Sequence, residues 1–201
     1  MNDYPTVISY YTHTWKYPNY AKKMQVACKN LGVECHIVPM PDTGWIDNTK
    51  KKPKFILDVL KELKRPVLWI DVDGTLYKTP DLFVGGYEYD WAAKRKRSSS
   101  DRTWHVGTMY FAYNPRVIRF IEAWVDEADK MDGSDELALE MLWRKQEPVV
   151  TELVIDELPV EYFQMLNANQ PDALRNTVIG HRASDGDSKR NYMKKKELTQ
   201  K

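Results

Sequence analysis

The N-terminal part of the chain alternates between short β-branched or aromatic runs and longer segments with helical periodicity. Residues 6–12 and 33–38 are predicted strands, and residues 18–31 and 53–63 place their apolar side chains on one helical face. A third apolar run, residues 66–70, is entered by a proline and has the length of a buried strand. Alternating strands and helices are typical of α/β domains built on parallel strands. We therefore predict one α/β domain of Rossmann-like architecture, with a mixed, mostly parallel sheet flanked by helices.

Two carboxylates, Asp71 and Asp73, follow the third predicted strand directly. In open α/β sheets, ligands bind just beyond the carboxyl ends of the strands, so both side chains should lie at the ligand-binding edge. Oxygen ligands of this kind suit Mg²⁺ or Mn²⁺, which proteins commonly hold with one or two carboxylates and the phosphates of a substrate. The alternative without chemistry is a polar turn in which Asp71 caps a neighbouring group. Two adjacent carboxylates repel one another in the absence of a cation, which favours the metal site.

The same motif allows two enzymatic interpretations. An Asp-X-Asp pair holds the metal of nucleotide-sugar glycosyltransferases, whereas Asp-X-Asp-Gly-Thr, as in residues 71–75, is the motif of haloacid-dehalogenase-type phosphatases, with Asp71 as nucleophile. Those phosphatases carry their nucleophile on the first strand, and here two strands and two helices come first. They also need an acidic pair just beyond a later strand, and the nearest candidate, Asp185, lies well past the predicted strand at residues 177–179. The order of elements thus favours the glycosyltransferase.

The remaining segments carry signals for loops, helix caps and further strands. Gly107 lies inside a strong strand pattern, and a glycine there suggests close approach of a ligand or of another backbone. Gly32 is a predicted stop of the helix at 18–31, Asn114 a predicted helix start, and Ser134 a predicted cap of the next helix. The remaining predicted segments are a loop at 39–50, a strand near solvent through residues 87–91, a mobile basic loop at 94–102, the strand at 104–113, and strands at 149–155, 160–163 and 177–179.

Length, charge and cysteine content limit what kind of protein this chain can be. The 201 residues suffice for one domain with a sizeable core, and we place it at residues 1–185, followed by a basic, flexible tail at 186–201. A net charge of +1 gives no global field to recruit nucleic acid or membrane. Two cysteines, Cys28 and Cys35, make no disulfide framework and suggest a reducing compartment. With neither a signal peptide nor a membrane-spanning run in view, we expect a cytoplasmic enzyme.

Four sequence features in order resemble the small nucleotide-diphospho-sugar transferases of the GT-A fold. They are Tyr-Tyr-Thr at residues 10–12, Lys-Pro-Lys-Phe-Ile at residues 52–56, the Asp-X-Asp strand followed by Pro80, and the stretch from His105 through Asn-Pro to Ser-Asp-Glu at residues 134–136. The resemblance covers about residues 6–181. The chain departs from the family pattern where His105 and Val106 replace Asn-Ser before Gly107, and where Glu136 replaces Gln.

The resemblance implies a metal-dependent transfer from a nucleoside-diphosphate sugar, most simply a UDP-sugar, to a hydroxyl acceptor. It implies that Asp71 and Asp73 bind Mn²⁺ or Mg²⁺ through the donor diphosphate, with His181 as a third ligand. The candidate catalytic residues are Asp135 and His105. Asp135 would be the carboxylate nearest the reacting carbon, as the base that deprotonates the acceptor in an inverting reaction or as a group that orients the sugar in a retaining one; the alternative is that it only caps its helix. His105 would contact the acceptor or simply fill a strand position. The expected donor-binding residues are Tyr10, Tyr11, Thr12, Lys54, Asp71, Gly107 and Lys189, with Arg190 as a second phosphate contact.

The acceptor is open at this level. The basic runs at 94–97 and 194–196 would suit phosphate contacts, so one specific hypothesis is a hydroxymethylated pyrimidine in DNA, as some phage-type enzymes glycosylate. A base in duplex DNA would have to be flipped out to reach the site. A further alternative is a fold that binds a nucleotide sugar without turnover.

Overall fold

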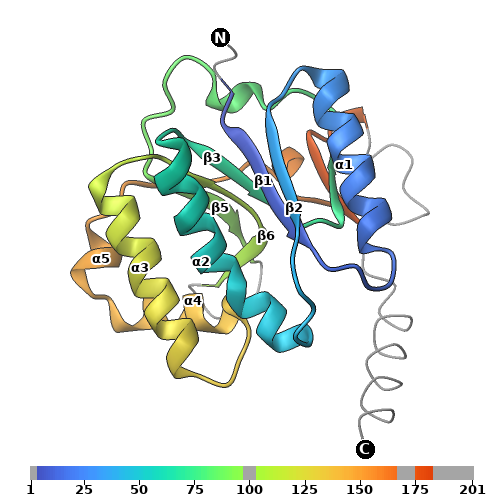
Figure 1. Ribbon diagram of the computed structural model, residues 1–201. Helices are drawn as coiled ribbons and strands as arrows, with labels where there is room; N and C mark the ends of the chain where they lie inside the picture. The colour runs from blue at the N-terminus through green and yellow to red at the C-terminus, as the bar shows by residue number, and fades with distance from the viewer. Residues whose placement is uncertain (1–3, 97–102, 167–174, 183–201) are drawn as a thin grey trace, which may run out of the picture.

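The computed structural model describes residues 4–96, 103–166 and 175–182 (Figure 1). Its main sheet has six strands in the order β2-β1-β3-β6-β5-β7. Neighbours pair in parallel at β2-β1, β1-β3 and β5-β7, and antiparallel at β3-β6 and β6-β5. The predicted fold class, a mixed and mostly parallel sheet flanked by helices, is confirmed. These strands are β1 (Thr6–Tyr11), β2 (Cys35–Pro39), β3 (Val67–Ile70), β5 (Trp91–Arg95), β6 (Trp104–Phe111) and β7 (Ile155–Glu157).

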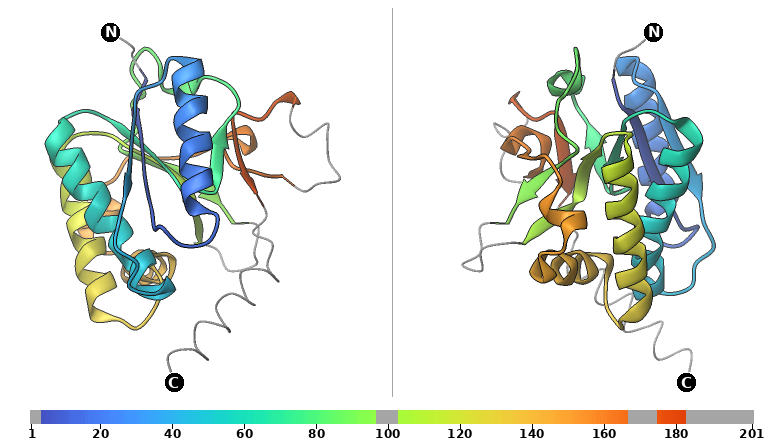
Figure 2. Two further views of the ribbon diagram at one scale, coloured as in Figure 1. Left: turned by 45° about the vertical axis from the view of Figure 1, so that its right-hand side comes forward. Right: turned by 90° about the vertical axis from the view of Figure 1, so that its left-hand side faces the viewer.

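A second, three-stranded sheet in the order β4-β9-β8 lies beside helix α1 (Figure 2). Its strands are β4 (Gly74–Leu76), β8 (Gln164–Leu166) and β9 (Ile179–Arg182). Strand β4 begins immediately after Asp73, so the chain passes from the main sheet into the small one at the Asp-X-Asp motif. Strands β4 and β9 are antiparallel and put Gly74 opposite His181.

Alternate residues of the central strands point to opposite faces of the main sheet, and both sets are apolar. Helices therefore cover both faces. Ile8 and Trp69 pack in a core with α2 (Trp45–Leu63), α3 (Pro115–Lys130), α4 (Asp135–Lys145) and α5 (Pro148–Thr151). Their neighbours Val7 and Leu68 pack on the other face with α1 (Tyr17–Leu31). Two short 3₁₀ turns, η1 (Asp81–Phe83) and η2 (Val160–Tyr162), close that second core.

Local signals account for several element boundaries. Helix α1 ends at Gly32, which adopts the left-handed conformation with φ 65°. Its backbone N–H donates hydrogen bonds to carbonyls of the last helical turn. The Asn114 side chain caps α3 by accepting a hydrogen bond from the Val117 N–H, and Ser134 caps α4 in the same way. These three predictions are confirmed, as is the long strand at β6.

Other boundaries differ from the prediction. Helix α2 begins at Trp45 rather than at Pro53, which lies inside the helix, so the predicted loop at 39–50 is much shorter. The chain at 149–155 forms α5 before entering β7, and the predicted strand at 160–163 is η2, because Pro148 and Pro159 each begin a turn of helix. The strand predicted near solvent through 87–91 starts only at Trp91, whose side chain is fully buried.

The last strand is also shifted along the chain. It runs over β9 rather than residues 177–179, so His181 lies within a strand and not just beyond one. Lys94 and Arg95 belong to β5, whereas most of the predicted basic loop, and the tail at 186–201 with Lys189 and Arg190, lie outside the described residues. No helix in the described part of the chain is both long and apolar enough to cross a membrane.

Candidate active site

A pocket opens at the carboxyl end of β1 and β3, between α2 and the start of α1. It is lined by aromatic and small polar side chains at one end and by the Asp-X-Asp motif at the other. The lining residues are Tyr10, Tyr11, Thr12, Tyr17, Trp45, Asn48, Thr49, Lys52, Trp69, Asp71, Val72 and Asp73. Five residues named from the sequence, namely Tyr10, Tyr11, Thr12, Asp71 and Asp73, are therefore brought together in one cavity.

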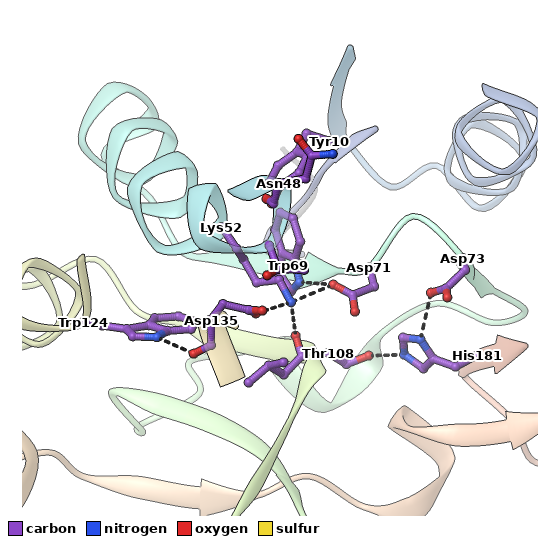
Figure 3. A network of polar contacts seen from close by, with 12 residues as sticks. Tyr10, Asn48, Lys52, Trp69, Asp71, Asp73, Thr108, Trp124, Asp135 and His181 are labelled. Carbon is purple, nitrogen blue, oxygen red and sulfur yellow. Dashed lines mark hydrogen bonds and ion pairs between the residues drawn. The ribbon is translucent and has the colours of Figure 1, made fainter. Parts of the chain in front are cut away.

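The carboxylate of Asp71 is held through one of its two oxygens. Its Oδ1 accepts a hydrogen bond from the Trp69 indole Nε1–H at 2.9 Å and lies 3.0 Å from the Lys52 ammonium (Figure 3). A methyl group placed on Gly107 would lie 3.5 Å from Oδ2, which shows that this second oxygen faces strand β6. The backbone supports the same arrangement, because the Asp71 N–H donates to the Gly107 carbonyl at 2.7 Å.

Lys52 is a buried cation that joins Asp71 to Asp135. Its Nζ lies 2.7 Å from Asp135 Oδ2 and donates to the Val106 carbonyl at 3.2 Å (Figure 3). Burial alone would lower the pKa of Lys52, but Asp135 and Asp71 outweigh it and hold that pKa above its ordinary value. The ammonium is therefore charged at neutral pH. The sequence analysis missed this residue.

Asp135 lies beneath Lys52 and is not among the residues that line the pocket. Only 3% of Asp135 is exposed, and its backbone carbonyl accepts a hydrogen bond from Trp124 Nε1–H at 2.9 Å. Burial raises the pKa of its carboxyl, and the Lys52 ammonium opposes that rise. The observed contacts make Asp135 the partner of Lys52, and its place nearest the reacting carbon stays a prediction.

His181 reaches the motif from the small sheet. Its Nδ1 lies 3.9 Å from Asp73 Oδ1, and its Nε2 lies 2.7 Å from Thr108 Oγ1 (Figure 3). Phe163 packs against His181 in a tilted arrangement, with ring centroids 4.5 Å apart, and stacks on the ring of His105 at 4.3 Å. Burial, Lys96 and the neighbouring His181 lower the pKa of His105 to about 4, so this imidazole is neutral at physiological pH.

Lys54 is not brought to the pocket. Its ammonium is exposed and pairs with Asp58 one turn along α2, whereas Lys52, two residues earlier, points inward. Residues two apart on a helix lie on different faces, so only one of the two lysines could reach the site. Gly107 does lie against the site, but its contacts are with Phe163, His181 and Asp71 rather than with the lined pocket.

The described side chains offer ligands for a metal ion without enclosing it. Within them, no group of three or more His, Cys, Asp or Glu side chains is gathered closely enough to enclose an ion. The donor set nevertheless fits a hard divalent cation that is completed by a substrate, because Asp71 Oδ2 and Asp73 provide carboxylate oxygens and His181 Nδ1 faces Asp73. Two carboxylates plus phosphate oxygens are a usual environment for Mg²⁺.

Comparison with known proteins decides the family. The family model of the nucleotide-diphospho-sugar transferases matches residues 20–193. The chain belongs to this family. It is a glycosyltransferase that uses a nucleotide-sugar donor, so the phosphatase with Asp71 as nucleophile and the module without turnover are both set aside.

Solved structures agree at the level of the fold. A glycosyltransferase involved in glycosylation of the major capsid of PBCV-1 superposes with a TM-score of 0.68 at 11% identity, over 95% of this chain and 99% of that one. The apo form of glycosyltransferase GlyE from Streptococcus pneumoniae TIGR4 gives 0.58 at 16% identity, over 90% of this chain but 55% of that one. Galactosyltransferase LgtC superposes with a TM-score of 0.51 at 10% identity, over 90% of this chain and 87% of that one. No curated protein matches the sequence.

Proposed function

We propose that this glycosyltransferase binds a nucleoside-diphosphate sugar, with UDP as the nucleotide, in the pocket between β1, α2 and the Asp-X-Asp motif. The observation that carries the proposal is the layout of that pocket, which runs from aromatic side chains at the end of β1 to the two carboxylates beyond β3. Tyr11, Tyr17 and Trp45 offer flat apolar surface for a base, and Thr12 offers a hydroxyl near a ribose. The diphosphate would then lie at Asp71 and Asp73.

Asp71, Asp73 and His181 would hold Mn²⁺ or Mg²⁺ together with the diphosphate. When bound, such an ion acts as a Lewis acid that stabilises negative charge on the departing nucleoside diphosphate. The chain's own part is to orient these groups. Lys52 and Trp69 fix the rotamer of Asp71, and Asp135 fixes Lys52. His105 stays neutral and stacked on Phe163, and its proposed role is to contact the acceptor.

The charge balance of the site supports a divalent cation. Asp71, Asp73 and Asp135 carry three negative charges, and Lys52 supplies one positive charge to the buried pair. Lys52 contacts both Asp71 and Asp135, so this one ammonium is shared between two carboxylates. A diphosphate placed beside these carboxylates needs a cation to offset the repulsion between the negative charges.

Donor binding tests the proposal directly. Isothermal titration calorimetry with UDP, other nucleoside diphosphates and their sugars should show binding that requires Mn²⁺ or Mg²⁺. Asp73→Asn should abolish the metal-dependent part, while Asp58→Asn, which alters an exposed carboxylate on α2, should leave it intact. Donor binding that is equally strong without metal, or unchanged in Asp73→Asn, would contradict the proposal.

For the acceptor we propose a hydroxyl group, with a hydroxymethylated pyrimidine in DNA as the specific candidate to test. The described part of the basic run at 94–97 adds no support to the DNA hypothesis, because Lys94 pairs with Glu157, Lys96 pairs with Glu136, and Arg95 lies over the Trp104 ring. Sugar transfer to hydroxymethylated but not to unmodified DNA, together with binding that weakens steeply with salt, would support it. Transfer only to small acceptors would remove DNA from consideration.

A further inference from the structure

His181 occupies a space that two glycines leave open. Strand pairing puts it opposite Gly74, where an added methyl group would lie 3.0 Å from His181 Cε1. A methyl group on Gly107 would lie 3.2 Å from the same carbon. A methyl group on Gly74 would also lie 2.6 Å from Ile70 Cγ2, so the glycine that directly follows Asp73 makes room for both the imidazole and Ile70.

The ring is also held from its face and from one edge. Phe163 packs against it in a tilted arrangement, with ring centroids 4.5 Å apart and an interplanar angle of 31°. Thr108, which is 0% exposed in strand β6, places its Oγ1 2.7 Å from Nε2 (Figure 3). Only 4% of His181 is exposed. These contacts leave the imidazole one orientation, in which Nδ1 points toward Asp73 at 3.9 Å.

A neutral imidazole has one N–H and one lone pair, so a hydrogen bond at one nitrogen decides what the other nitrogen presents. If Nε2 carries the proton and donates to Thr108, then Nδ1 presents its lone pair to the space beside Asp73. If the Thr108 hydroxyl donates instead, the proton lies on Nδ1, and this nitrogen cannot bind a cation. Outer-shell hydrogen bonds commonly fix the tautomer of metal-binding histidines in this way.

We propose that Thr108 is a positioning residue: its hydroxyl oxygen accepts from His181 Nε2–H and thereby presents the Nδ1 lone pair, beside Asp73, to a divalent cation. This inference rests on the metal site of the proposed function, but the tautomer can be measured without metal. Thr108→Val removes the hydroxyl at nearly constant shape, and Thr108→Ser retains it. Thr6→Val is the matched control, because Thr6 is buried in β1 and its Oγ1 has no hydrogen-bond partner among the described residues.

The test is ¹⁵N NMR of the full metal-free chain, with labelled histidine, at pH 8, where an ordinary histidine is neutral. A His181→Gln spectrum identifies the signals among the four histidines. We expect the Nε2–H tautomer in the parent chain, in Thr108→Ser and in Thr6→Val, and a mixture of tautomers in Thr108→Val. A parent chain with the proton on Nδ1, or tautomer populations that Thr108→Val leaves unchanged, would overturn the inference.

Mn²⁺ titration of the same proteins tests the role of Thr108 separately from the existence of the metal site. With donor diphosphate present, Thr108→Val should bind Mn²⁺ about 10–100-fold more weakly than the parent chain, and Thr108→Ser should recover most of the affinity. Equal affinity in folded Thr108→Val and parent protein would overturn the role of Thr108 and leave the proposed metal site standing. If His181 of the parent chain carries its proton on Nε2 but the chain binds no Mn²⁺, the proposed metal site is overturned instead.

Discussion

At the scale of single residues, the site depends on a buried lysine. Lys52 places one positive charge between Asp71 and Asp135 and donates a third hydrogen bond to the Val106 carbonyl. Its ammonium also lies over the Trp69 ring, 5.3 Å from the centroid. A charge taken out of water is tolerated only when it is paired and hydrogen-bonded, and Lys52 meets both conditions. Removal of Lys52 therefore affects both stability and the orientation of Asp71.

Lys52→Met should lower the free energy of unfolding by about 3–5 kcal/mol, because it leaves Asp135 buried without its counter-charge. Lys54→Met on the same helix removes an exposed lysine and should change the free energy by no more than about 0.5 kcal/mol. The double variant Lys52→Met/Asp135→Asn should recover part of the loss. Urea denaturation at pH 7 measures all three. Equal stability of Lys52→Met and Lys54→Met would refute the pairing.

The position of Asp71 and Asp73 at the end of a buried strand, where they line the pocket, could be predicted from the sequence, whereas the role of Lys52 was not predicted. Asp71 and Asp73 are local signals, since they directly follow an apolar strand. Lys52 and Lys54 flank one proline on an amphipathic helix, and only the helical period separates them. Lys52 lies four residues before the buried Ile56, whereas Lys54 lies four residues before the exposed Asp58. The partners that hold Lys52 inside, Val106 and Asp135, come from distant parts of the chain and could not be predicted locally.

At the scale of elements, Asp90 ties the start of β5 to its surroundings. Its buried carboxylate accepts hydrogen bonds from Asn114 Nδ2 at 2.7 Å, Arg116 Nε at 2.8 Å and the Val154 N–H at 2.9 Å. It thus joins β5 to the beginning of α3 and to the entry of β7. Burial would raise the pKa of Asp90, but these donors outweigh it and lower that pKa below its ordinary value.

A lowered carboxyl pKa stabilises the fold at pH values above the pKa of the unfolded chain, about 3.9, and this contribution is lost as the pH falls through the folded-state pKa. Asp90→Asn should therefore be less stable than the parent chain by about 1.5–3 kcal/mol at pH 7. The difference should shrink below pH 4. Urea denaturation at pH 7 and at pH 3 compares the two proteins. An equal difference at both pH values would show that Asp90 does not act through its charge.

Elements were predictable where a local signal was strong. Gly32, Asn114 and Ser134 marked helix ends correctly, and the alternation of the first strands and helices gave the fold class. The elements from Val149 to Phe163 were not predicted correctly. The β-branched residues of this region favour strands, whereas its two prolines each start a helical turn, and the helical turns formed.

At the scale of the whole molecule, the site forms where two sheets meet. Strand β3 of the main sheet ends at the Asp-X-Asp motif, β4 of the small sheet begins directly after it, and β9 pairs with β4 to deliver His181. Sequence alone suggested His181 only through the family resemblance, since the strand pairing that places it is long-range. The aromatic pocket at the end of β1 completes the site on the other side.

The central claim is that Asp71 and Asp73 hold a divalent cation against the diphosphate of the donor. The most direct measurement is the anomalous scattering of Mn²⁺ in crystals of the chain grown with UDP. We predict one Mn²⁺ peak bounded by Asp71 Oδ2, an oxygen of Asp73, His181 Nδ1 and the diphosphate, with the base in the pocket of Tyr11, Tyr17 and Trp45. A UDP molecule bound there with no ion at Asp71 and Asp73, or an ion away from them, would contradict the account.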